Sequence, residues 1–215
     1  VDGITAVGAM DLMMDDWGID GVVTGSQKGL MIPPGLAFLA LSEKAWRTAE
    51  KSSLPKYYFD LKKARKAVKD NDTPWTPAVS LIIGVDQALE MIRAEGIENV
   101  WKRHDRLARS IRAAVQALGL KVLAKCPSNA LTAVSIPSSV DARQFNKTLK
   151  NSYGITVAGG QGHLKGKIFR ISHLGYYDEL DMTAMITALE LTLKDCGYKF
   201  ELGTGLRAAI SAFST

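Results

Sequence analysis

The stretch "VVTGSQKGLMIPPGLAF", residues 22–38, consists of a short apolar run, a small polar loop and a second apolar run. The two apolar runs predict buried strands, and Pro33-Pro34-Gly35 excludes a helix between them. A single cation, Lys28, stands in the loop among small or amide-bearing neighbours. Small residues let a ligand approach the backbone, and open α/β sheets bind ligands where their strands end. The stretch therefore predicts that Lys28 lies in a ligand site.

The loop around Lys28 narrows the chemistry of that site. A lysine held at the end of a buried sheet can act as a nucleophile toward carbonyl groups and form a Schiff base. A phosphate-binding P-loop is excluded, because Lys28 follows Gln27 and precedes Gly29 instead of lying between glycine and serine or threonine. The alternative that stays open is an ordinary solvated loop lysine, which is what most lysines are.

The composition is that of an ordinary globular protein, with 215 residues of which 47% are hydrophobic and 23% charged. No apolar run reaches the roughly 18–20 residues that span a bilayer. The net charge is +5, but the basic residues are scattered, and clusters such as Lys62, Lys63, Arg65 and Lys66 are expected to face solvent. Because no aromatic-interleaved basic stripe accompanies the charge, we expect neither nucleic acid nor a membrane as a partner.

The N-terminal part of the sequence predicts an α/β arrangement. Strands are expected at residues 20–24 and 36–41, and Ser42 is a plausible N-cap for a helix over residues 43–51. Residues 55–77 combine proline, aromatic and polar clusters, so we expect them to form a long, mostly exposed connection.

The remainder of the chain alternates helical and strand patterns. Apolar spacings of three and four residues, closed by glycines, predict helices at residues 78–96, 100–119, 141–154 and 179–197. Short β-rich runs predict strands at residues 120–124, 130–136, 155–159 and 167–172. The pattern therefore predicts two blocks, an α/β block over residues 1–77 and, over residues 78–215, connecting helices followed by an α+β block.

Several segments together resemble one known family. They are "VDGITAVGAM", "DDWGIDGVVTGSQKGLMIPPGLAF", "TPWTPAVSLIIGVDQALEMI", "GGQGHLKGKIFRISHLG" and "FELGTGLRAA". The sequence resembles the class V aminotransferases, and within them the serine/alanine–glyoxylate aminotransferase type, over essentially all of its residues. The resemblance implies an α/β fold of the PLP-dependent transferases (aspartate aminotransferase-like, fold type I). It implies part of the large domain, residues 1–77, followed by interdomain helices and the C-terminal small domain.

The resemblance also implies roles for individual residues. Lys28 matches the lysine that forms a Schiff base with pyridoxal 5'-phosphate (PLP), and Asp2 matches the aspartate that keeps the pyridine nitrogen protonated. Ser26 and Gln27 match the stretch that helps to hold the cofactor phosphate. Arg170 matches the arginine that binds the substrate α-carboxylate, a task that suits the two parallel donors of a guanidinium. The alternative for Arg170 is a solvent-facing position on an antiparallel strand.

Assembly and completeness follow from the same resemblance. The "TPWTP" segment matches a loop that reaches the cofactor phosphate of a second subunit, through Thr76 or, with the placement shifted, Thr73. We therefore expect a homodimer in the cytoplasm that converts small amino acids and keto acids. The phosphate-binding turn and the ring-stacking aromatic residue of the family precede the position of Asp2, so we expect a further N-terminal segment.

Three other readings stay open. One is another PLP reaction on the same fold, such as desulfuration or a lyase reaction; a desulfurase needs a mobile cysteine, for which Cys126 is the candidate. A second is the soluble hydrogenase subunit, a name that some relatives carry, although no cysteine cluster is present to bind nickel or an iron–sulfur centre. The third is an inactive fragment.

The remaining histidines and cysteines predict no metal site. His104 lies on an apolar helical face and is expected in the core, whereas His163 and His173 are candidates to line the entrance of the site. Cys126 and Cys196 lack metal-ligand spacing, and we expect them to be buried thiols of a reduced cytosolic protein.

Overall fold

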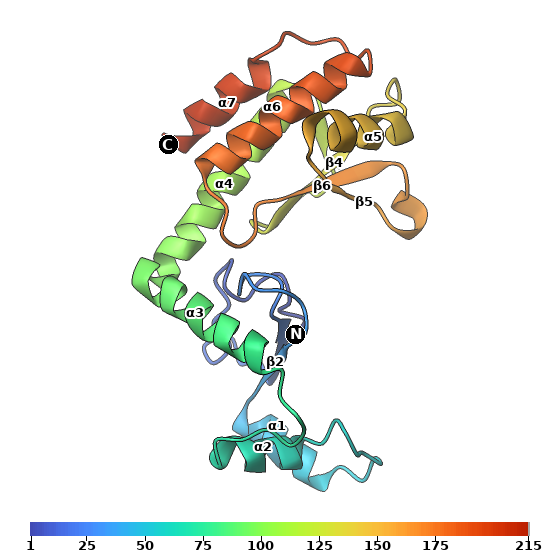
Figure 1. Ribbon diagram of the computed structural model, residues 1–215. Helices are drawn as coiled ribbons and strands as arrows, with labels where there is room; N and C mark the ends of the chain where they lie inside the picture. Colours follow the sequence, from blue (N-terminus) through green and yellow to red (C-terminus); the bar gives the residue numbers. More distant parts are fainter. Residues whose placement is uncertain (215) are drawn as a thin grey trace. The chain divides into compact units, whose positions relative to one another are not determined.

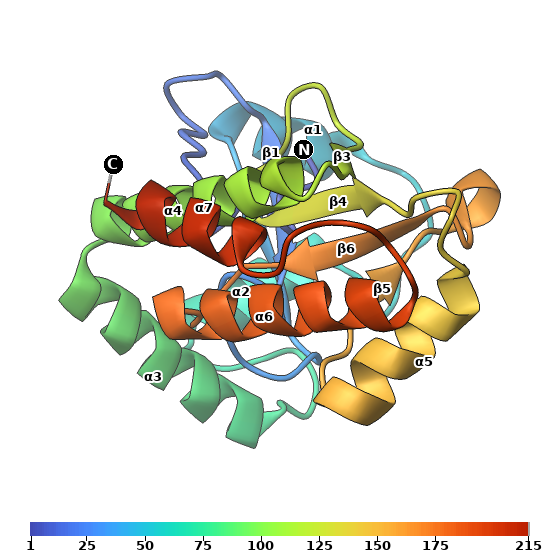
Figure 2. The same cartoon turned by 90° about the horizontal axis from the view of Figure 1, so that it is seen from above.

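The computed structural model describes residues 1–214 and divides into two compact units at Gly96 (Figures 1 and 2). The first unit contains β1 (Gly21–Gly25), β2 (Ala37–Leu41), α1 (Glu43–Lys51), α2 (Leu61–Lys69) and α3 (Val79–Glu95). The second contains α4 (Ile97–Ala117), β3 (Lys121–Val122), β4 (Leu131–Ser135), α5 (Ala142–Tyr153), β5 (Ala158–Gly159), a 3₁₀ turn (Gly162–Leu164), β6 (Ile168–Ser172), α6 (Glu179–Asp195) and α7 (Thr204–Phe213). The first unit comprises Val1–Gly96, so it includes α3.

The sheet of the first unit is the predicted strand–loop–strand unit. β1 and β2 are antiparallel, with Val23 opposite Leu39. A short stretch around Asp2 runs parallel to β1 on its other side, where the Gly3 amide donates to the Val23 carbonyl over 2.9 Å. A single bridge, between Asp2 and Val23, therefore joins the N-terminal segment to β1.

The helices of the first unit follow their capping residues. Ser42 caps α1, as predicted, by accepting from the Ala45 amide. α2 lies within the segment that was expected to be a connection, so that expectation was wrong. Asp60 caps α2 by accepting from the Lys62 and Lys63 amides, and none of the helix's residues is buried. α3 packs on the loop between the strands, where Gly84 faces the Ile32 side chain at contact distance.

The second unit is a four-stranded antiparallel sheet in the order β3-β4-β6-β5, with helices against one face (Figure 1). Its core lies between this face and α4, α5, α6 and α7. Phe145 of α5 and Phe169 of β6 are fully buried, with ring centroids 4.8 Å apart. Figure 2 shows α7 beside α4 and α6. The α+β block is thereby confirmed, although β3 and β5 are only two residues long.

α7 was not predicted, because its N-terminal cap comes from elsewhere in the sequence. Its N-cap residue, Gly203, provides no side chain, and the buried carboxylate of Glu190 on α6 accepts instead from the amides of Gly205 and Leu206 at 2.7 and 3.0 Å. Among residues 1–214, no helix combines the length and apolarity needed to cross a membrane.

Candidate functional site

Lys28 lies in the loop that follows β1 and is partly exposed. Its ammonium group has no hydrogen bond or ion pair with any residue that the structure describes. The loop closes on itself, because the Met31 amide donates to the Lys28 carbonyl over 2.9 Å and the Ile32 amide to the Ser26 carbonyl over 3.2 Å. The chain therefore holds the backbone around Lys28 while leaving its amine free to react.

Asp2 lies at the same edge of the sheet as this loop. It pairs in parallel with Val23 of β1, and parallel strands direct their carboxyl ends to one edge. The carboxylate is exposed, and its Oδ1 accepts from the Ile4 amide at 2.9 Å. One carboxylate oxygen is thus fixed by the backbone, and the other has no protein partner in the described chain.

A contact between two glycines joins the segment after Asp2 to the Lys28 loop. A Cβ built on Gly29 would lie 2.2 Å from the Val7 carbonyl oxygen and 3.1 Å from the Gly8 Cα. Gly8 has a φ of +81°, which favours glycine, and a Cβ there would meet Gly29 at 3.2 Å. The two backbones therefore touch directly and fix the segments that carry Asp2 and Lys28. Gly8 was not among the residues predicted from the sequence, because an isolated glycine in "AVGAM" is its only signal.

Ser26 and Gln27, expected at the cofactor phosphate, differ in their surroundings. Ser26 is fully buried, its hydroxyl donates to the Pro33 carbonyl at 2.8 Å, and it accepts from the Leu36 amide at 3.2 Å. Gln27 is exposed, and its amide oxygen lies over Gly25. The Ser26 hydroxyl is thus already used to shape the loop, whereas the Gln27 amide is accessible to a ligand.

Thr76, which was expected to reach a second subunit, is exposed on the segment before α3, and its hydroxyl has no partner in the described part of the chain. Thr73 is also exposed, but its hydroxyl donates to the Trp75 carbonyl over 2.6 Å. The Trp75 ring stacks on Tyr58 with centroids 5.2 Å apart. Thr76 is therefore the more available of the two hydroxyls.

Arg170 lies in the middle of β6, on the sheet face opposite the helices. Its neighbours Phe169 and Ile171 face the core, and Ala133 and Ala158 flank it on the adjacent strands. The Nε atom donates to the Gly159 carbonyl over 3.1 Å, which fixes the guanidinium plane. Within residues 1–214 the two terminal nitrogens have no partner, so the paired donors are free for a carboxylate.

The histidines of the second unit are structural where they are buried. His104 is fully buried, as predicted; it contacts the Val100 carbonyl through Nδ1 at 2.8 Å and accepts from the Gly175 amide through Nε2 at 2.9 Å. The expectation that His173 lines an entrance was wrong, because its side chain is fully buried. Burial lowers the pKa of His173 from 6.5 to about 4. His163 is exposed in the 3₁₀ turn.

The two cysteines are free thiols, and Cys126 is exposed between β3 and β4, so its expected burial was wrong. Burial is the main reason why the pKa of Cys196 is raised, followed by the charge of Asp195. In the part of the chain that the structure describes, no three histidine, cysteine or acidic side chains are placed to hold a metal ion.

Known proteins are similar to this chain in both sequence and fold. The family model for class-V aminotransferases matches residues 1–181. The chain is 47% identical to the soluble hydrogenase small subunit of Synechococcus sp. (strain PCC 6716), over 100% of this chain and 56% of that protein. It is 39% identical to the serine–glyoxylate aminotransferase of Hyphomicrobium methylovorum, over 100% of this chain and 54% of that protein.

A solved structure gives the same result for the fold. The pyridoxamine-pyruvate aminotransferase from Mesorhizobium loti superposes with a TM-score of 0.94 at 34% identity, over 100% of this chain and 56% of that one. The chain thus has the fold of the corresponding part of the fold type I, PLP-dependent transferases, and spans about half the length of the relatives it matches. The loop that carries Lys28, the strand that carries Arg170 and these matches agree: the chain belongs to the class-V aminotransferases.

Proposed function

We propose that the protein is a PLP-dependent aminotransferase, and that this chain provides the lysine, the ring-nitrogen partner and the substrate-carboxylate arginine of its active site. The observation that carries the proposal is the unpaired amine of Lys28, held at the end of β1 beside the segment of Asp2. Family membership gives this geometry its chemical meaning.

The residues fit the cofactor. Lys28 offers a free amine to an aldehyde, Asp2 a carboxylate to a protonated ring nitrogen, and Gln27 an exposed amide to a phosphate. The Gly8–Gly29 contact allows a backbone approach that larger residues would block. Ser26 supports the loop from inside, and we assign it that role in place of a direct phosphate contact.

Each residue then has a defined task. When bound, PLP supplies an electron sink for the negative charge that forms at the substrate Cα. The Lys28 amine holds the cofactor and, once released, moves the proton at that carbon as a general base. The Asp2 carboxylate keeps the ring nitrogen protonated. Arg170 binds the substrate carboxylate with both terminal nitrogens and thereby orients the Cα–H bond.

Substrates and assembly are part of the same proposal. Serine or alanine as amino donor, and glyoxylate or pyruvate as acceptor, agree with the names of the serine–glyoxylate and pyridoxamine–pyruvate relatives. The exposed and unpaired Thr76 supports a homodimer in which this loop reaches the partner's cofactor phosphate. Two free thiols agree with a cytoplasmic protein.

Chemical labelling tests the assignment of Lys28. Borohydride treatment of the full-length protein with PLP should attach the cofactor irreversibly to Lys28, as shown by peptide mass spectrometry. Lys28→Ala should remove both the label and transamination while the circular dichroism spectrum is kept. Lys125→Ala, which removes an exposed loop lysine of the second unit, is the matched control and should keep both. A label on another lysine would refute the assignment.

The desulfurase alternative depends on Cys126. Its exposed position between β3 and β4 satisfies the need for an accessible thiol. Cysteine desulfuration by the full-length protein that disappears in Cys126→Ser, with transamination absent, would favour this alternative. Transamination that Cys126→Ser leaves unchanged supports the aminotransferase.

A further inference from the structure

α1 and α2 carry the positive charge of the whole chain. Together they hold eight lysines and arginines and two glutamates, a net charge of +6, whereas the complete sequence has +5. The rest of the chain is therefore slightly acidic. The basic residues of α1 and α2 face solvent, as expected, but they are concentrated in these two helices and not scattered along the chain.

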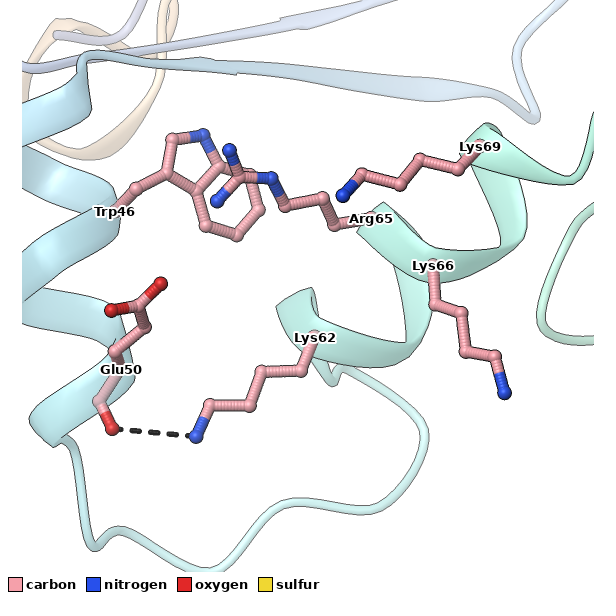
Figure 3. Close-up of a pocket in the computed structure, with 6 residues that line it drawn as sticks. All are labelled: Trp46, Glu50, Lys62, Arg65, Lys66 and Lys69. Atoms are coloured by element: carbon pink, nitrogen blue, oxygen red, sulfur yellow. Dashed lines mark hydrogen bonds between the residues drawn. The ribbon is translucent and has the colours of Figure 1, made fainter.

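The cations of α2 gather on one face of the helix and line a pocket of about 490 Å³ between α1 and α2 (Figure 3). Its lining consists of Trp46, Glu50, Lys62, Arg65, Lys66 and Lys69. The four cations follow one another at spacings of three, one and three residues, so they share a face of the helix. The volume lies within the range of small-molecule sites.

The pocket holds its cations with little compensation. The Lys62 ammonium donates to the backbone carbonyl of Glu50 over 3.3 Å, and Glu50 provides the single carboxylate of the lining. The ammonium groups of Lys66 and Lys69 have no bonded partner among residues 1–214. Like charges three and four residues apart repel each other in a helix, so an anion bound here would relieve an existing repulsion.

One of the cations is already held in position. The Arg65 guanidinium lies over the Trp46 ring, 4.4 Å from its centroid, and is 3.9 Å from the Glu43 carboxylate. Figure 3 shows Lys69 extended toward the same side as Arg65, while Lys66 turns outward. A planar guanidinium that is fixed by stacking offers paired donors to phosphate oxygens. Flexible lysines beside it add charge that adapts to the ligand.

We propose that this pocket binds a small phosphate anion that carries two or more adjacent phosphate groups. A single carboxylate or phosphate would pair with only part of this charge, whereas a di- or triphosphate brings several negative charges to the Arg65 guanidinium and to lysines whose flexible side chains can turn toward it. The site is distinct from the Lys28 loop, with which it shares no lining residue.

Isothermal titration calorimetry of the full-length protein tests the proposal. The protein is saturated with PLP and freed of excess, so that the cofactor site is filled before inorganic tripolyphosphate is added in 150 mM NaCl. Lys66→Gln with Lys69→Gln should weaken binding about tenfold, because two unpaired charges are lost. The matched control, Lys147→Gln with Lys150→Gln, removes the same charge at the same spacing from exposed positions on α5 and should change affinity less than twofold.

The possible outcomes distinguish specific binding in the pocket from nonspecific attraction between the anion and a positively charged surface. Equal loss in the two double variants, or no binding of tripolyphosphate at millimolar concentration, overturns the proposal. A selective loss in the α2 variant supports it, and repeating the titration with ATP then shows whether a nucleotide binds more tightly than the bare phosphate chain. Unchanged transamination in the α2 variant would show that the effect does not arise at the Lys28 site.

Discussion

Acidification should destabilise the second unit through His173, which follows the strand that carries Arg170. The His173 side chain is fully buried, and its Nδ1 lies 2.8 Å from the Asn129 carbonyl oxygen, which only accepts hydrogen bonds. Nδ1 therefore carries the proton, and Nε2 accepts from the Thr132 hydroxyl at 3.1 Å. A second proton on Nε2 would break this arrangement and bury a charge.

The size of the effect follows from the shifted pKa. Burial, together with the positive charge of Arg112, lowers the pKa of His173 from 6.5 to about 4, although the hydrogen bond to Asn129 opposes the shift. Between these pH values the unfolded chain binds more protons than the folded one, so the free energy of unfolding falls as pH decreases from 6.5 to 4. Over the whole interval the loss is about 3 kcal/mol, of which about 2 kcal/mol should be seen between pH 7 and pH 5.

Urea unfolding at pH 7 and pH 5 measures this loss in the full-length protein. His173→Gln, whose amide can still donate and accept, should be less stable at pH 7 but should lack the His173 contribution to the pH dependence. His163→Gln removes an exposed histidine and should leave the pH dependence as in the unmodified protein. A histidine NMR titration in which His173 has a midpoint near 6.5 would refute the reasoning, as would identical pH dependences in all three proteins.

Two further substitutions test the site and its support. Arg170→Lys should lower kcat/KM for the amino donor, which corresponds to a loss of about 2–4 kcal/mol of transition-state stabilisation, because one ammonium cannot replace two parallel donors. PLP absorbance should be retained. Unchanged kinetics would place carboxylate binding elsewhere. Glu190→Gln should lower the free energy of unfolding by about 2–3 kcal/mol, measured in urea, because the two carboxylate oxygens accept from the amides of Gly203, Gly205 and Leu206, and one of these oxygens would become an amide nitrogen. A loss below about 1 kcal/mol would show that α7 does not depend on this cap.

The sequence predicted best those elements whose signals are local. The strands on either side of Lys28 and the helices that end at Gly96 and Gly154 were found, because apolar spacing and terminal glycines are read from neighbouring residues. For Arg170, alternation along β6 supported only the alternative position on the open face of the sheet, and the structure does place Arg170 opposite the core-facing residues Phe169 and Ile171. Its neighbours on the adjacent strands, Ala133 and Ala158, come from distant parts of the chain and could not be predicted.

The elements that were missed depend on contacts distant in sequence or on no burial at all. α2 has no buried residue, and its local signals, the cap at Asp60 and the apolar Leu61, Ala64 and Val68 at helical spacing, lie within a strongly charged segment. α7 is capped by Glu190 from the preceding helix. The burial of His173 is decided by its packing beneath Asn129 and Thr132, which are more than forty residues away.

The candidate residues of each unit, taken separately, follow one principle. The backbone around each reactive side chain is satisfied within the chain: the Ser26 hydroxyl closes the Lys28 loop, and the Gly159 carbonyl fixes the Arg170 guanidinium. The reactive atoms themselves, the Lys28 amine and the Arg170 terminal nitrogens, have no partner in the described residues. A ligand that binds them need not break a protein hydrogen bond, and the surrounding loop loses little entropy on binding. For this reason substitutions at Ser26 should disturb the geometry of the loop, whereas substitutions at Lys28 should remove its chemistry and leave the fold intact.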